Sequence, residues 1–219
     1  MYKFLTKHQP SSLDQIIFPD MATELKFSSY VDGYGFDHIL MHGPHGTGKS
    51  TLARLLPKLI ASDLKDGDFM FFDAAKDGSA TRFRELADSF FATTAWNDTG
   101  YKFFVIDEAD SLSAEAKRLL RGIFDRANGN TMIMVTSNDL SKIDPGIVDR
   151  CKVFNFSCSE PTYQLYRAQQ ILQAEGVDIP EAVLFDFIKV HGHSIRELMR
   201  SLEDIVQAIR SKDQPAPQA

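Results

Sequence analysis

The 219-residue sequence has little cysteine, no long apolar stretch and no excess of positive charge. Its two cysteines, Cys151 and Cys158, are too few for a disulfide framework, or for a four-ligand zinc site without nearby histidines. No apolar run approaches the roughly 18 residues that a membrane-spanning helix needs, and the first residues lack the apolar region of a signal peptide. We therefore expect a soluble, cytoplasmic protein with reduced cysteines, without zinc and without a membrane partner.

The charge balance limits how this chain could contact nucleic acid. The 24 Lys and Arg residues face 30 Asp and Glu residues, which gives a formal net charge of −6. A protein that coats itself with nucleic acid is basic overall. Any such contact must therefore be confined to one face of the molecule, or be shared with other subunits.

Apolar runs alternate with segments of helical periodicity over the first 158 residues. The runs are apolar throughout, which is typical of strands in a parallel sheet that is covered on both faces. We predict a five-stranded parallel sheet between helices, hence an α/β fold. The predicted strands are 37–42, 69–73, 101–106, 132–137 and 152–156, and the predicted helices are 20–30, 51–62, 81–94 and 114–128.

After residue 158 the sequence shows only helical spacing, in the segments 160–175, 180–190 and 194–210. The length of the chain suits one α/β core and a small second unit. We therefore predict an α/β core over residues 1–158, a small all-helical domain over 159–211 and a flexible tail over 212–219.

A glycine-rich segment lies between the first predicted strand and the next helix. Residues 43–50 (GPHGTGKS) match the phosphate-binding pattern G-x-x-x-x-G-K-[ST] without a mismatch. Such a loop points backbone N–H groups at phosphate oxygens, and the following helix adds positive potential. Lys49 would reach the β- and γ-phosphates, and the Ser50 hydroxyl would bind Mg²⁺. The predicted nucleotide contacts of this segment are Gly43, Pro44, His45, Gly46, Thr47, Gly48, Lys49, Ser50 and Thr51.

Acidic residues follow the third predicted strand. Asp107 would supply the hard oxygen ligand that Mg²⁺ prefers, directly or through water, and Glu108 would act as the general base toward the attacking water. Asp110 is more simply interpreted as an acid at a helix N-terminus. With the glycine-rich loop, these acids predict nucleoside triphosphate hydrolysis with Mg²⁺ bound.

Three further residues are catalytic candidates, and each has an ordinary alternative. Asn138 follows the fourth predicted strand, at the edge where parallel sheets bind ligands, and would either orient water or form a turn. Arg150 and Arg196 would either neutralise the transferred phosphoryl group or lie on the solvated surface.

This set of residues resembles the AAA+ ATPases, and within them the clamp-loader ATPase subunits of the archaeal, eukaryotic and large-phage small-subunit type. Residues 7–10 (KHQP) and 13–17 (LDQII) resemble the opening K-Y-R-P-x-x-[LF]-D-[DE]-[IV]-[IV], which packs around adenine in that family. His8 and Gln9 depart from its Tyr and Arg. The resemblance implies adenine contacts from Pro10, Ile16 and Ile17.

Two further matches concern the arginines. Residues 148–151 (VDRC) resemble the family's S-R-C motif, which implies that Arg150 acts in trans on the ATP of an adjacent subunit. Residues 192–198 (GHSIREL) resemble the G-D-x-R-x-x-L motif of the helical lid, which implies that Arg196 contacts the γ-phosphate in cis.

The family also has segments that approach DNA, and two stretches of this chain resemble them: 73–84 and 116–121. The resemblance implies DNA contacts from Arg82, Arg84 and Arg121, whereas the alternative is a solvated helix face. It further implies other AAA+ subunits, a sliding clamp and primer–template DNA as partners.

The resemblance implies an ATP-hydrolysing motor subunit of a sliding-clamp loader that acts in a multi-subunit assembly. Two alternatives stay open. One is an AAA+ helicase loader or a DNA-transposition-type regulator, which the short length favours. The other is a non-hydrolysing structural clamp-loader subunit, although intact Lys49, Ser50, Asp107 and Glu108 argue against it. Clamp-loader subunits of this type carry a third, helical collar domain, which we expect this chain to lack.

Overall fold

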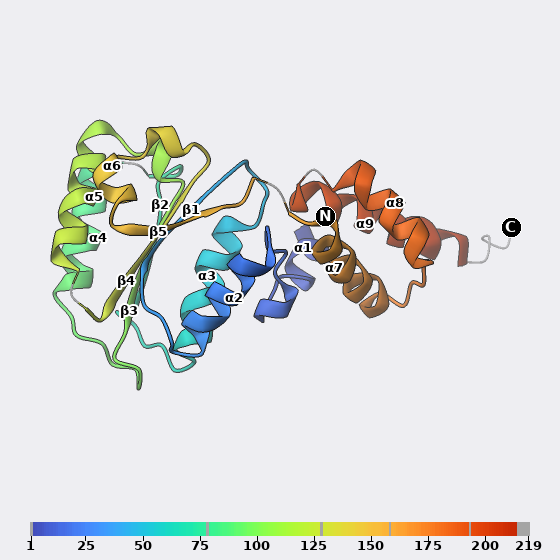
Figure 1. Cartoon of the computed structure of the whole chain (residues 1–219), viewed down its shortest axis with the longest axis horizontal. Helices are drawn as coiled ribbons and strands as arrows, with labels where there is room; N and C mark the ends of the chain where they lie inside the picture. The colour runs from blue at the N-terminus through green and yellow to red at the C-terminus, as the bar shows by residue number, and fades with distance from the viewer. Residues whose placement is uncertain (1, 78, 128, 158, 193, 214–219) are drawn as a thin grey trace, which may run out of the picture.

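A parallel β-sheet lies between two layers of helices, and a group of further helices adjoins it at one end (Figure 1). This computed structural model describes residues 2–77, 79–127, 129–157, 159–192 and 194–213. Within these residues, no helix is long and apolar enough to cross a membrane.

The sheet contains five parallel strands in the order β2-β3-β4-β1-β5, which confirms the predicted α/β class. In this order β1 lies between β4 and β5, and its last residue pairs with Ser137 and Asn155. The carboxyl ends of β1, β3 and β4 therefore meet at one edge of the sheet. The strands are β1 (His38–His42), β2 (Phe69–Asp73), β3 (Lys102–Asp107), β4 (Thr131–Ser137) and β5 (Cys151–Asn155).

Helices cover both faces of the sheet, because its central strands are apolar on both sides. Alternate residues of β3 show this: Phe103 and Val105 pack toward one layer, and Phe104 and Ile106 toward the other. One layer consists of α2 (Met21–Val31) and α3 (Lys49–Ile60), and the other of α4 (Ala80–Phe91), α5 (Ala114–Arg126) and α6 (Pro145–Val148).

Local signals set where the helices begin. Ser79 and Ser113 precede α4 and α5, and each side-chain oxygen accepts a hydrogen bond from a backbone N–H in the first turn. Helix α3 begins at Lys49, two residues before the predicted start, because Gly48 of the glycine-rich loop is its N-cap. Single-turn 3₁₀ helices connect other elements: η1 (Leu13–Gln15), η2 (Ala109–Ser111) and η3 (Leu140–Lys142).

The remaining helices form a separate layer, which we call the helical unit: α7 (Pro161–Ala174), α8 (Glu181–His191) and α9 (Ile195–Asp213). The unit has its own apolar core, and Phe4 of α1 (Tyr2–Lys7) and Ile17 are part of it. The sequence assigns residues 1–158 to the α/β core, but the packing places α1 against the helical unit (Figure 1). Residues 214–219 of the predicted tail lie outside the described residues.

Of the two cysteines, Cys151 is a free thiol at the start of β5. Burial raises the pKa of this thiol to about 12, so it is protonated at neutral pH. Cys158, at the predicted boundary between the two domains, lies outside the described residues.

Candidate nucleotide-binding site

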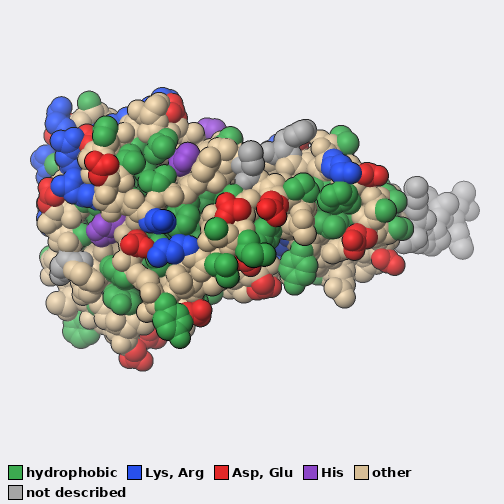
Figure 2. All heavy atoms as spheres, viewed as in Figure 1, with side chains coloured by type: hydrophobic (Ala, Val, Ile, Leu, Met, Phe, Trp, Pro, Cys, Tyr) green, Lys and Arg blue, Asp and Glu red, His purple; other side chains and the backbone are tan. Residues whose placement is uncertain are grey.

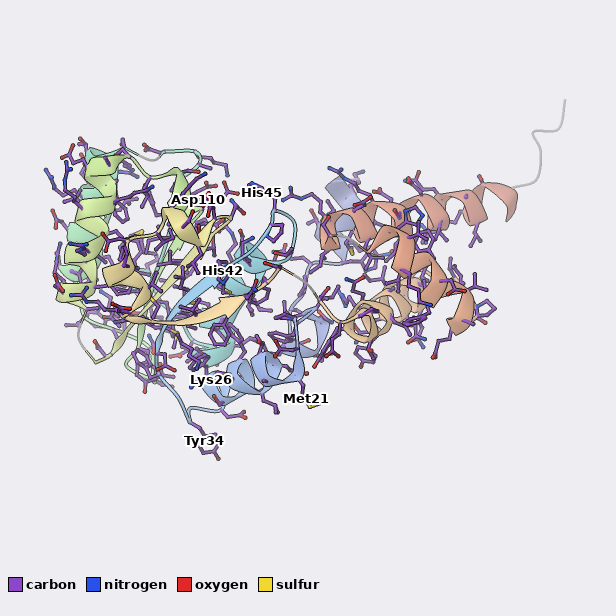
Figure 3. All side chains as sticks on the ribbon, turned by 45° about the horizontal axis from the view of Figure 1, so that its top comes forward. Met21, Lys26, Tyr34, His42, His45 and Asp110 are labelled. Carbon is purple, nitrogen blue, oxygen red and sulfur yellow. The ribbon has the colours of Figure 1, made fainter. Side chains whose placement is uncertain are left out.

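A cavity of about 420 Å³ lies between the carboxyl edge of the sheet and the helical unit. All predicted nucleotide contacts line it except Gly43 and Pro44, which form the base of the loop. Of the catalytic candidates, Lys49, Glu108, Asn138 and Arg196 line it, and Arg150 does not. In Figure 3, His45 and Asp110 lie at the same end of the sheet, above β1.

The glycine-rich loop follows β1 and needs glycine at two positions for steric reasons. Gly43 has φ +142°, and a Cβ atom there would lie 2.7 Å from the carbonyl carbon of Phe156. Gly48 has φ +91° and directly precedes α3. L-residues with a side chain rarely adopt these angles, so the loop geometry depends on both glycines.

Lys49, the first residue of α3, folds back over the loop. Its Nζ donates hydrogen bonds of 2.7 Å to the backbone oxygens of Gly43 and of Pro44, and the residue is 5% exposed. Burial lowers the pKa of this ammonium group, and the nearby Asp107 and Glu108 oppose the shift. The ammonium is held by loop carbonyls rather than by a carboxylate, which leaves its charge for an anionic ligand.

Ser50 and Asp107 meet at the point where a magnesium ion would be needed. The Ser50 hydroxyl donates to Asp107 Oδ1 over 2.7 Å, and Thr136 Oγ1 lies 2.5 Å from the same oxygen. A hydroxyl and a carboxylate beside a phosphate loop are hard oxygen donors of the kind that Mg²⁺ binds, with few protein ligands and several waters. The residues present therefore fit a magnesium ion.

Glu108 is placed by its backbone. Its φ of 54° is the one positive value among the described non-glycine residues, and its N–H donates to Thr136 Oγ1 over 2.9 Å. The side chain is about one-third exposed, and its Oε1 lies 3.9 Å from His45 Nδ1. Thr136 thus fixes both Asp107 and Glu108, a role that the sequence alone does not suggest.

Asn138 lies at the end of β4, supported by Asp110. One oxygen of Asp110 accepts from the Asn138 backbone N–H over 3.1 Å and from the Ser137 hydroxyl over 3.3 Å. Asp110 lies in the first turn of η2, as its simpler interpretation predicts, and it also joins η2 to the end of β4. The Asn138 side chain lines the cavity.

Arg196 enters the cavity from the helical unit, in the first turn of α9. Its backbone N–H donates to the Gly46 oxygen over 3.2 Å, which joins the start of α9 to the glycine-rich loop. The helical unit therefore contacts the loop directly.

Another part of the cavity lining, which we call the base end, comes from the N-terminal segment and the helical unit and includes the predicted adenine contacts Pro10, Ile16 and Ile17. His8 and Arg167 line the same end, and Arg167 Nη2 donates to the His8 backbone oxygen over 2.7 Å. Burial lowers the pKa of Arg167. Arg167 belongs to no sequence motif, and its position on the buried side of α7 is the only signal that the sequence gives for it.

Arg150 directly precedes β5, beside α5 and α6 and outside the cavity. Its guanidinium donates to the Gly146 oxygen over 2.8 Å and to Asp125 over 3.0 Å. The side chain is 43% exposed. Within one chain, therefore, Arg150 does not reach the phosphate loop.

The three predicted DNA contacts lie on the helical layer farthest from the cavity. Arg82 and Arg84 are on α4 and Arg121 is on α5, and all three side chains are more than half exposed. Each is near a carboxylate: Arg82 Nη1 lies 3.5 Å from Glu85, Arg84 Nη2 lies 3.4 Å from Glu115, and Arg121 donates to both oxygens of Asp144. Figure 2 shows Lys and Arg side chains gathered at this end of the molecule.

The sheet order, the loop after β1 and the Ser50–Asp107 pair define a P-loop nucleotide-binding protein. Residues 39–158, more than half of the chain, match the family described as "ATPase family associated with various cellular activities (AAA)". The chain belongs to this AAA ATPase family.

Relatives and solved structures agree with this assignment. The chain is 26% identical over 206 residues to "Replication factor C small subunit 1" of Pyrobaculum arsenaticum, covering 94% of this chain and 62% of the relative. It is 27% identical over 202 residues to "Replication factor C subunit 5" of Mus musculus, covering 91% and 59%. The chain thus spans about three-fifths of the length of these relatives. The Thermotoga maritima RuvB Holliday junction branch migration motor has the same fold, with a TM-score of 0.68, 16% identity and coverage of 93% and 67%.

Proposed function

We propose that this chain is the ATP-hydrolysing motor part of a sliding-clamp loader, which acts with other AAA+ subunits on primer–template DNA where DNA is replicated. The observation that carries the proposal is that Lys49 and Ser50 line one cavity, and that the Ser50 hydroxyl is hydrogen-bonded to Asp107. The replication factor C names of relatives that align with over 90% of this chain support the finer assignment.

Each residue at the phosphate end has a separate task in this proposal. Lys49 binds the β- and γ-phosphates, and Ser50 and Asp107 hold Mg²⁺, which would neutralise phosphate charge. Glu108 accepts the proton of the attacking water, and Asn138 orients that water. Arg196 contacts the γ-phosphate from the helical unit, so residues 159–211 act as a lid over the core of residues 1–158.

Arg150 has its task in a neighbouring subunit. Its guanidinium is exposed and lies outside the cavity of its own chain, which suits an arginine that completes an adjacent site. Trans arginines contribute about 10³–10⁵ in turnover to related phosphoryl transfers. An isolated subunit should therefore hydrolyse ATP slowly, and assembly should accelerate it by more than about tenfold.

The test measures ATP turnover of the assembled complex with Arg150→Ala, and with Arg126→Ala as the control. Arg126 is another exposed, carboxylate-paired arginine, which lies on α5. We expect turnover to fall at least about tenfold for Arg150→Ala and to stay unchanged for Arg126→Ala. Equal turnover of the two variants would exclude the trans role.

Two measurements separate the other functions. Binding of the cognate sliding clamp by the purified assembly supports a clamp loader, whereas a ring or filament without clamp affinity favours a helicase loader or transposition-type regulator. Nucleotide binding without turnover in the full assembly would indicate a structural subunit.

For DNA, we propose contacts from Arg82, Arg84 and Arg121, tested by the salt dependence of binding in the triple glutamine variant.

A further inference from the structure

Glu175 is a buried carboxylate at the end of α7, and the proposed mechanism does not use it. Its side chain is 1% exposed. Three cationic or polar donors converge on it: Lys7 Nζ at 2.7 Å, Arg210 Nη2 at 2.6 Å, and His8 Nε2. These contacts lower the pKa of Glu175 to about 2.

The donors come from distant parts of the chain. Lys7 and His8 are at the N-terminal end, directly before the predicted adenine contact Pro10, whereas Arg210 is in the last turns of α9. Glu175 therefore joins the segment that forms the base end of the cavity to two helices of the helical unit. Helix α1 accordingly lies beside α7 and α9 in Figure 1.

His8 is the link between Glu175 and the cavity. It lines the cavity, while its ring contacts Glu175 and packs against Phe4 at 4.6 Å between ring centroids. Its backbone oxygen accepts the hydrogen bond from Arg167 described above. Glu175, at the C-terminal end of α7, therefore fixes the side chain of His8, and Arg167 of α7 fixes its main chain.

We propose that Glu175 is a positioning residue that fixes the base end of the nucleotide site to the helical unit. Segment 7–10 and the helical unit then move together, and the base end forms only when the unit is in place. The inference rests on the proposed nucleotide-binding function, and it adds that base recognition is controlled from outside the cavity. The phosphate end should depend little on Glu175, because Lys7, His8 and Arg210, which Glu175 contacts, all lie outside the segment 43–51.

The experiment compares the affinities of the full chain for ATP and for inorganic triphosphate, which has no base, by calorimetry. The variant is Glu175→Gln, which keeps the shape of the side chain and removes its charge. The control is Glu24→Gln. Glu24 also joins the α/β core to the helical unit, through a 2.5 Å hydrogen bond from the Tyr163 hydroxyl, but it does not line the cavity.

We expect Glu175→Gln to weaken ATP binding about tenfold and triphosphate binding less than about twofold, because only the base end loses its support. The control should change neither. Steady-state turnover adds a second readout: KM for ATP should rise while kcat at saturating ATP stays within about twofold.

Arg210→Gln serves if Glu175→Gln does not fold. Arg210 does not line the cavity, and its guanidinium donates to Glu175, so its effect on ATP affinity should follow that of Glu175. We expect a change in the same direction but smaller. An unchanged ratio of ATP to triphosphate affinity in the folded variants, or an equal change in Glu24→Gln, overturns the inference. If the parent chain binds neither ligand, the proposed function itself fails.

Discussion

The phosphate end and the base end of the cavity are built in different ways. The phosphate end is one continuous segment, residues 43–51, which comprises the glycine-rich loop and the start of α3. Hydrogen bonds join it to the ends of the neighbouring strands β3 and β4. The base end is assembled from the first seventeen residues and from α7 and α9, with a hydrogen bond from Arg167 to His8 across 159 positions of sequence. Local backbone geometry thus determines one end, and tertiary packing determines the other. Changes at each end should therefore have separable effects.

The largest expected effect at the phosphate end follows from Glu108→Gln. A general base contributes about 10²–10⁴ to such reactions, so ATP turnover in the assembly should fall at least about 100-fold. ATP affinity should stay within about threefold, because the amide keeps the size of the side chain. Turnover and binding are measured on the same preparation. If turnover persists, Glu108 is not the general base toward the attacking water.

Gly43→Ala should disrupt the phosphate end through a steric clash with the backbone. A Cβ atom there would lie 2.7 Å from backbone atoms of Phe156, and the φ of +142° disfavours alanine. We expect about 2–4 kcal/mol of destabilisation, measured by urea unfolding. Gly122→Ala is the matched control, because a Cβ at Gly122 meets nothing within 4 Å. Equal stability of the two variants would mean that the loop can shift.

Thr136→Val tests whether the Thr136 hydroxyl supports Asp107 and Glu108 at the metal site. The change keeps the shape and removes the hydroxyl that contacts Asp107 and Glu108. We expect a loss of about 1–3 kcal/mol in stability and a higher Mg²⁺ concentration for half-maximal turnover. Affinity for adenosine, which contacts only the base end, should stay the same. A fall in adenosine affinity would show that the two ends are coupled.

A further effect concerns pH and belongs to the base end. The pKa of Glu175 is about 2 in the folded chain, below its ordinary value near 4.5. A depressed carboxyl pKa stabilises the fold above the unfolded pKa, and this contribution disappears as pH falls through the folded pKa. The difference in free energy of unfolding between the parent and Glu175→Gln should therefore be constant near neutral pH and shrink from about pH 4.5 to about pH 2. A difference that is independent of pH would mean that Glu175 carries no depressed pKa.

Much of the fold follows from the sequence, because the elements of the α/β part are long runs of one periodicity. All five strands form near their predicted positions, as do the helices between them and those of the helical unit. Two short helices, α1 and α6, were not predicted. Each is six residues or fewer, so neither has enough turns for a helical period to show.

The residues of the site likewise fall into those that the sequence reveals and those that only the structure reveals. The spacing of the phosphate loop and of the acids Asp107 and Glu108 can be read directly from the sequence. In the structure Glu108 lines the same cavity as the loop, and Asp107 is hydrogen-bonded to Ser50. Thr136, Arg167 and Glu175 carry no motif. Their roles depend on which strand neighbours which, and on how the N-terminal segment folds back onto α7.

The sequence by itself determined the class of fold and the identity of the phosphate loop, because backbone angles and strand periodicity are local properties. Only the tertiary structure decided that the N-terminal segment and the helical unit together line the base end of the cavity, and that a buried Glu175 holds residues 7 and 8 against α9. The physical reason is that burial and ion pairing act between residues far apart in the chain. Their separation in the sequence does not tell how close they lie in the folded structure.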